Sequence, residues 1–177
     1  MFEKKEISDF TNLIDDFSLH TRAFLKIQDG CDSFCSYCVI PYVRGSIKSR
    51  DIKDIYQEID LLANKDYKEI VLTGIHIGKF GKDTGQNILD ILKYIEKKEQ
   101  ILRLRLSSFE PMEITDELID FIKTSKKVCK HFHIPLQSGD NYILKQMNRN
   151  YNVEMYKEKI DKIKCKLGKS SVSTDII

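Results

Sequence analysis

The chain has 177 residues, of which 41% are hydrophobic and 32% are charged, so it can bury one apolar core of ordinary domain size. Its formal net charge of +2 is too small to indicate nucleic-acid binding by itself, because such proteins usually carry a pronounced basic surplus or stripe. The N-terminus has no apolar signal core and no apolar run approaches a membrane span, which favours a cytoplasmic protein without membrane association. Five cysteines are an odd number, and nothing indicates secretion, so a disulfide-based fold is disfavoured.

The apolar pattern alternates between strand-like and helix-like segments from the beginning. Residues 23–27 form a short strand-like run, residues 52–63 place four aliphatic side chains on one helical face, and residues 69–73 form a buried strand. Asn87 is placed to cap the following helix, and Thr115 to open a later one. Each strand is thus followed by a helix.

The alternation continues through the second half of the chain. Residues 103–108 and 132–136 read as strands, and residues 172–177 begin a fifth strand. Residues 141–147 and 153–164 carry helical patterns. Strands that alternate with helices predict a parallel sheet with right-handed crossovers.

The later strands are apolar on one face only. Strands covered on both faces read as nearly continuous apolar runs, and a closed barrel fills its interior with branched aliphatic side chains. The pattern therefore favours an open, partial barrel that encloses a charged ligand, with placement of some polar residues at solvated strand ends as the alternative. The polar positions are Arg103, Arg105, His131, His133, Ser171, Ser173 and Asp175.

Three cysteines, Cys31, Cys35 and Cys38, follow the first strand within one short loop. Soft thiolate ligands select zinc, copper(I) or iron–sulfur clusters, and three protein ligands leave one coordination position open. The alternative is a zinc site completed by Cys129, Cys165 or a histidine. Both of these cysteines are isolated in the sequence, and we interpret them as small buried hydrophobic residues outside the site.

The loop at residues 30–38 resembles the cluster loop of the radical S-adenosylmethionine (SAM) enzymes. Residues 27–31 and 39–45 resemble those of the methylthiotransferase branch, which adds sulfur and a methyl group to tRNA or a ribosomal protein. The resemblance runs from about Thr21 to the last residue. Within this branch, the sequence most resembles the enzymes that act on threonylcarbamoyladenosine beside the tRNA anticodon. Further similar stretches are residues 72–78, 105–111 and 133–140.

The resemblance implies an α/β fold, a partial (β/α)6 TIM-like barrel of the radical SAM type, here truncated in its fifth strand. It implies that Cys31, Cys35 and Cys38 are catalytic metal ligands that hold three irons of a [4Fe–4S] cluster, while SAM chelates the fourth iron. Barrel enzymes place their chemistry at the carboxyl ends of the strands, which is where this loop is expected to lie.

Four further residues are candidates for cofactor binding. Tyr37 matches the aromatic position that lies against the adenine in this superfamily, and its alternative is a packing aromatic on the loop. Gly74 ends the second predicted strand, where the absence of a Cβ allows close approach of the cofactor, although the superfamily's glycine-glycine-glutamate pattern is replaced here. Glu110 and Gln137 lie just beyond the third and fourth strands, where they either bind cofactor or substrate or are solvated.

Basic residues follow the cysteine loop. Arg44, Lys48 and Arg50 either contact phosphate or form a solvated basic turn. Three histidines are interpreted as hydrogen-bonding rim or interior residues instead of metal ligands: His76, His131 and His133.

The resemblance also sets the expected domain organisation and partners. We expect residues 1–20 to be a linker tail from an N-terminal domain that holds a second [4Fe–4S] cluster, and residues 21–177 to be a radical SAM core incomplete at its C-terminus. tRNA is the implied partner of the full-length protein, with a reductant such as flavodoxin or ferredoxin, and the chain alone is not expected to complete the reaction. The alternatives are a sister methylthiotransferase for isopentenyl-modified adenosine or a ribosomal aspartate, another radical SAM enzyme, and a zinc-binding module.

Overall fold

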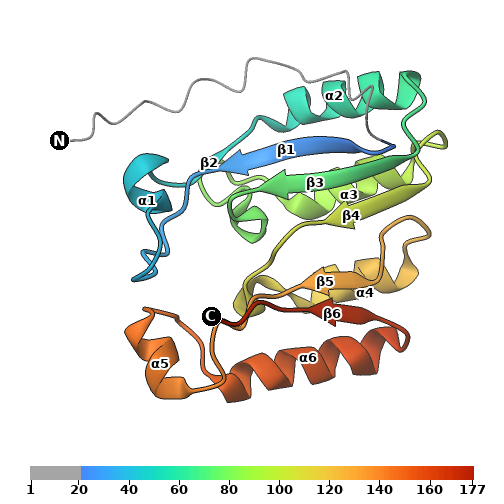
Figure 1. The fold of residues 1–177 in the computed structure, drawn as a ribbon. Coiled ribbons are helices and arrows are strands. Elements are labelled where there is room, and N and C mark those ends of the chain that lie inside the picture. The colour runs from blue at the N-terminus through green and yellow to red at the C-terminus, as the bar shows by residue number, and fades with distance from the viewer. Residues whose placement is uncertain (1–20) are drawn as a thin grey trace.

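A computed structural model of the chain describes residues 21–177, so the linker predicted for residues 1–20 lies outside the described residues. The described part is an α/β fold in which strands and helices alternate, as the sequence predicts. The parallel strands form a curved, open layer with the longer helices on its outer side, and their carboxyl ends all lie at one end of the molecule (Figure 1). Loops at this end are therefore brought together.

The first sheet has four strands in the order β2-β1-β3-β4. β1 (Ala23–Asp29) pairs in parallel with β3 (Glu69–Gly74), which pairs in parallel with β4 (Arg103–Leu106). The two-residue β2 (Lys48–Ser49) pairs antiparallel with the end of β1 and was not predicted. Its shortness explains why periodicity did not identify it.

The second sheet continues the same layer with β5 (His131–His133) paired in parallel with β6 (Ser171–Ser173). A single parallel bridge between Leu104 and Val128 connects it to β4. β5 and β6 are shorter than the strands predicted for residues 132–136 and 172–177, although a bridge between Gln137 and Ile176 extends their pairing. The described residues thus form an open, partial barrel.

Helices connect consecutive strands, and side chains cap them where the sequence indicated. The Asn87 side chain accepts a hydrogen bond from Leu89 N (2.9 Å) and Thr115 Oγ1 accepts one from Leu118 N (3.2 Å). The long helices are α2 (Ile52–Asn64), α3 (Ile88–Glu96), α4 (Asp116–Thr124) and α6 (Val153–Leu167). Shorter ones are α1 (Ile40–Val43), α5 (Asn141–Gln146) and the 3₁₀ turns η1 (Ile77–Lys79) and η2 (Pro111–Glu113).

The core lies between the outer face of the sheet and the long helices. Alternate strand residues point into it and are almost completely buried, and the apolar faces of α2, α3 and α4 cover them. The buried strand residues include Leu25, Ile70, Leu72, Leu104, Leu106 and Phe132. Among the described residues, no helix combines the length and apolarity that a membrane span requires.

The inner face of the sheet is polar, as the alternation predicted. Glu69 accepts hydrogen bonds from Arg105 Nε (2.7 Å) and Arg103 Nη1 (3.2 Å) on the neighbouring strand. Ser173 Oγ lies 3.1 Å from His131 Nε2 and 3.0 Å from His133 Nδ1. These strand residues are paired with one another in addition to contacting solvent.

Candidate functional site

The cysteine loop begins with a turn that only glycine fits. Gly30 has a φ of +71°, and a Cβ there would lie 2.0 Å from the carbonyl oxygen of Ser46. The buried side chain of Gln28 donates to the carbonyl oxygens of Asp29 (2.6 Å) and Gly30 (2.7 Å), while Asp29 Oδ1 accepts from Gly30 N (2.8 Å). The loop therefore starts from a fixed direction at the end of β1.

The three cysteines line one cavity of about 330 Å³ at the carboxyl ends of β1, β3 and β4. Three of the four residues predicted to bind cofactor line it as well: Tyr37, Gly74 and Glu110. Gln137 is not among the lining residues, but its Oε1 is buried and lacks a hydrogen-bond partner among the described residues. Gln137 has a φ of +70°, a backbone conformation that residues other than glycine rarely adopt.

Gly74 is required by packing within the protein itself. A Cβ at this position would lie 3.0 Å from both the carbonyl and the side-chain oxygen of Gln28 and 2.9 Å from Ile77 Cγ2. Gln28 Oε1 also accepts a hydrogen bond from His76 N (2.7 Å). Gly74 thus lets β3 approach β1 closely and places His76 beside the first cysteine.

Cys31, His76 and Glu113 form a chain of polar contacts at the cavity wall. Cys31 Sγ lies 3.4 Å from His76 Nδ1, and His76 Nε2 lies 2.5 Å from Glu113 Oε1. Burial opposes ionisation of the Cys31 thiol, but hydrogen bonds from His76 and Ser33 outweigh it and lower the pKa of Cys31 to about 7. For His76, burial lowers the pKa, but the hydrogen bonds with Cys31 and Glu113 outweigh burial and raise the pKa to about 9. These contacts favour ionisation of the Cys31 thiol to the thiolate, which is the form that binds metal.

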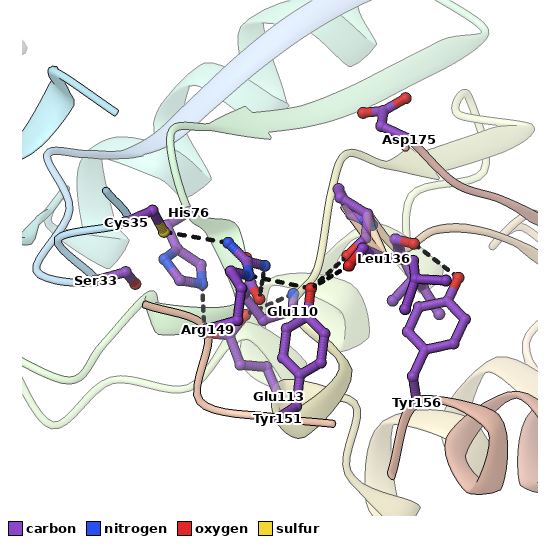
Figure 2. Close-up of polar contacts among 12 residues, drawn as sticks. Ser33, Cys35, His76, Glu110, Glu113, Leu136, Arg149, Tyr151, Tyr156 and Asp175 are labelled. Atoms are coloured by element: carbon purple, nitrogen blue, oxygen red, sulfur yellow. Dashed lines mark hydrogen bonds and ion pairs between the residues drawn. The ribbon is translucent and has the colours of Figure 1, made fainter. Parts of the chain in front are cut away.

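Arg149 contributes a second set of contacts, shown in Figure 2 between Cys35 and Glu110. Its Nη1 lies 3.2 Å from Cys35 Sγ and 3.4 Å from the Tyr37 hydroxyl, and its Nη2 donates to Glu110 Oε2. Its Nε donates to the Tyr151 hydroxyl at 3.1 Å. Burial alone would lower the pKa of Arg149, but the carboxylate of Glu110 outweighs burial and raises the pKa. The guanidinium therefore stays charged.

Other residues singled out from the sequence lie elsewhere. Cys129 and Cys165 do not line the cavity, as predicted, but neither is buried: Cys129 is partly exposed and Cys165 is exposed. Arg50 is not available for phosphate, because it is buried and forms an ion pair with Glu58 at 2.5 Å. Arg44 is half-exposed and pairs with Asp29 at 3.3 Å.

Sequence reasoning missed Glu113, Arg149 and Tyr151. They are separated from the cysteines by about 80 to 120 positions, so no local spacing connects them. Two signals were present in retrospect. Glu113 follows the predicted third strand closely, as Glu110 does, and Arg149 and Tyr151 lie between two predicted helices beyond the fourth strand.

Comparisons with known proteins agree with this geometry. The model of the Radical SAM superfamily matches residues 25–177. Threonylcarbamoyladenosine tRNA methylthiotransferase MtaB of Bacillus subtilis is 40% identical over 179 residues, which cover 100% of this chain and 38% of that protein. tRNA-2-methylthio-N(6)-dimethylallyladenosine synthase of Natranaerobius thermophilus is 41% identical over 180 residues, covering 98% of this chain and 40% of that protein.

Solved structures agree in fold. The radical SAM methyltransferase TsrM from Kitasatospora setae, with cobalamin and a [4Fe–4S] cluster bound, has a TM-score of 0.65 at 17% identity over 86% of this chain and 30% of its own. The cobalamin-dependent radical enzyme OxsB, with aqua-cobalamin and SAM bound, has a TM-score of 0.69 at 17% identity over 87% of this chain and 23% of its own.

The structure defines an open α/β barrel with three cysteines in one cavity at the carboxyl ends of its strands. The chain belongs to the Radical SAM superfamily, whose model matches residues 25–177. It spans about two fifths of the length of the curated relatives named above. The donor set fits the cluster of that superfamily, because three soft thiols on one loop share a cavity that also has room for a ligand. Within residues 21–177, no three His, Cys, Asp or Glu side chains are grouped so as to hold a single metal ion.

Proposed function

We propose that the chain is the catalytic core of a radical SAM methylthiotransferase that adds a methylthio group to threonylcarbamoyladenosine next to the tRNA anticodon. The observation that carries this proposal is the cavity shared by the three cysteines, in a chain aligned over its full length with a relative of that name. The cytoplasm is the proposed location.

The residues of the cavity are assigned roles by their positions. Cys31, Cys35 and Cys38 would hold a [4Fe–4S] cluster with one iron left for SAM, and the bound pair would supply one-electron cleavage of the carbon–sulfur bond of SAM. Tyr37 and Glu110 line the same cavity, and their proposed role is to orient SAM there. Gln137 remains a proposed contact on the strength of its unpartnered amide oxygen.

The protein groups around the cavity prepare it before any cofactor binds. The hydrogen bond from His76 lowers the pKa of the Cys31 thiol, and Gly74 allows β3 to approach β1 closely beside the cysteine loop. Phe109, Ile75 and Pro135 contribute apolar side chains to the wall of the same cavity.

The partners are part of the proposal. tRNA is the proposed substrate, and a flavodoxin or ferredoxin is the proposed electron donor. A second [4Fe–4S] cluster, the proposed source of the inserted sulfur, would be bound by residues outside this chain, and the chain alone is expected not to methylthiolate tRNA.

A sister reaction on isopentenyl-modified adenosine is the second candidate. The Natranaerobius thermophilus relative that is named for it is 41% identical to this chain, and the Bacillus subtilis relative is 40% identical. Overall identity therefore does not discriminate between the two substrates, and only the resemblance of residues 27–31 and 72–78 favours the first.

Metal binding is tested by anaerobic reconstitution with iron and sulfide. The wild-type protein is expected to bind four irons at this site with absorbance in the violet, and replacement of all three cysteines by alanine is expected to abolish it. The matched controls Cys129→Ala and Cys165→Ala remove thiols outside the cavity and should bind iron normally. Full iron content in the triple variant would refute the site.

The substrate is tested by mass spectrometry of tRNA nucleosides from a deletion strain complemented with the full-length gene. Loss of methylthio-threonylcarbamoyladenosine, restored by the wild-type gene but not by Cys35→Ala, is the expected result. Loss of only the methylthio-isopentenyl form would establish the sister reaction in its place.

A further inference from the structure

A short segment between α5 and α6 clamps the middle of the cysteine loop. Met147 O accepts a hydrogen bond from Ser36 N at 3.1 Å, and Asn148 Nδ2 donates to Phe34 O at 2.9 Å. Asn148 has a φ of +56°, a left-handed conformation in which asparagine is several-fold enriched. Arg149 follows directly and enters the cavity wall beside Cys35. The clamp therefore presents Arg149 from a fixed backbone.

The direction of the Arg149 guanidinium is fixed by two acceptors on either side of it. Glu110 accepts from Nη2, and the Tyr151 hydroxyl accepts from Nε. The Tyr151 hydroxyl oxygen lies 3.0 Å from Leu136 O, beyond β5 (Figure 2). It also lies 2.9 Å from Pro135 O. These acceptors leave Nη1 directed at Cys35 Sγ.

Burial makes this contact stronger than a surface contact of the same length. The side chain of Arg149 is 5% exposed, so its charge is weakly screened by water. A charged donor within 3.2 Å of a thiolate stabilises negative charge on sulfur, and hydrogen bonds to cluster sulfurs are among the features that set the reduction potential of an iron–sulfur cluster. One-electron reduction adds negative charge to the cluster, and a fixed cation favours it.

We infer that Arg149 is a positioning residue that holds Cys35 in the cavity wall and raises the reduction potential of the cluster proposed for this site. The inference rests on the proposed function, because it requires that the three cysteines bind a cluster. The segment between α5 and α6 would then tune the reduction of the cluster, in addition to holding the cysteine loop in place.

The test is a redox titration followed by electron paramagnetic resonance on the full-length protein, reconstituted anaerobically. The signal of this cluster is the one absent from the triple alanine variant of the cysteines. Arg149→Met removes the charge and keeps much of the volume, Arg149→Lys keeps the charge without the guanidinium fork, and Arg44→Met is the matched control. Arg44 is half-exposed and pairs with Asp29, without a contact to a cysteine.

For Arg149→Met we expect at least a tenfold fall in the ratio of reduced to oxidised cluster at a fixed solution potential, about 59 mV for a one-electron couple. Arg149→Lys should show a smaller fall, Arg44→Met none, and iron and sulfide per chain should stay at the wild-type level. A wild-type potential in Arg149→Met at equal iron content overturns the inference.

Two further outcomes separate the possible failures. If Arg149→Met does not fold, Arg149→Gln takes its place as the uncharged variant, because a wild-type potential in a folded Arg149→Gln protein overturns the claim and a lower one supports it. If the wild-type protein shows no signal that depends on the three cysteines, the proposed function fails, and the inference fails with it.

Discussion

The two faces of the sheet differ in composition and in what they do. On β3 and β4 the outward residues Ile70, Leu72 and Leu104 are fully buried under helices, whereas Glu69 and Arg105 on the inner face are paired with each other and partly exposed. Burial of a large aliphatic side chain contributes about 1.5–3 kcal/mol, but an exposed ion pair contributes about 0–1 kcal/mol. Stability therefore comes mainly from the outer face, which leaves the inner face and its rim free to carry polar groups for chemistry.

The largest difference between the faces is expected for adjacent residues of β3. Leu72→Ala on the outer face should destabilise the fold by about 2–5 kcal/mol, because it leaves a cavity in a close-packed core. Val71→Ala on the inner face is the matched control and should cost less than half as much, since Val71 is only partly buried. Urea unfolding measures both free energies, and equal losses would contradict the assignment of the faces.

An intermediate effect is expected for Glu69, which Arg103 and Arg105 contact on the inner face. Burial raises the pKa of Glu69, but the hydrogen bonds from Arg105 and Arg103 outweigh it and hold the pKa below its ordinary value of 4.5. Glu69→Gln should therefore lower the free energy of unfolding at pH 7 by about 1 kcal/mol.

The pH dependence of this difference follows from the direction of the shift. A lowered pKa in the folded state gives stability that is fully present above the unfolded pKa and is lost as pH falls through the folded pKa. The difference between wild type and Glu69→Gln should thus be constant from pH 7 to about 5 and shrink below about pH 4.5. A difference that grows on acidification would contradict this charge arrangement.

The smallest effect is expected at the second sheet. His133 lies 3.0 Å from Ser173 Oγ and 3.1 Å from Asp175 Oδ2, and Asp175 is exposed. His133→Ala should change the free energy of unfolding by no more than about 0.5 kcal/mol, as is usual for surface contacts. A loss above about 2 kcal/mol in thermal or urea unfolding would mean that this part of the inner face is structural.

Periodicity and capping predicted most of the fold, because these signals are local. The alternation of β4, β5 and β6 residues indicated an open layer with a polar inner face, and the polar contacts of Glu69 and Ser173 lie there. The short β2 was missed, because its two residues are held by pairing with the end of β1 and have no pattern of their own.

The site was predictable only where its residues are adjacent in sequence or end a strand. Cys31, Cys35 and Cys38 share one loop, while Gly74 ends β3 and Glu110 follows β4 at the same edge of the sheet. Gly74 also permits a close approach to Gln28 that no sequence pattern indicated, and its contact with the cofactor stays a prediction.

The groups that hold the cysteines were not predictable in the same way. Arg149 reaches Cys35 through a helix-to-helix connection whose path depends on how α5 and α6 pack, so no local pattern indicates it. Glu113 acts through His76, which itself comes from the end of a different strand. Such contacts depend on tertiary packing, which no local sequence pattern indicates.

The distance along the chain between Cys35 and its clamp sets an order of events during synthesis. Arg149 follows Cys35 by 114 residues. At roughly 5–20 residues per second, a ribosome makes that stretch in on the order of 6–23 s. During that interval the three cysteines have already been synthesised, but the residues that later hold them have not. Loading iron onto a nascent chain would therefore act on an unformed site, so delivery by the cell's iron–sulfur assembly machinery is best timed after α6 has been made.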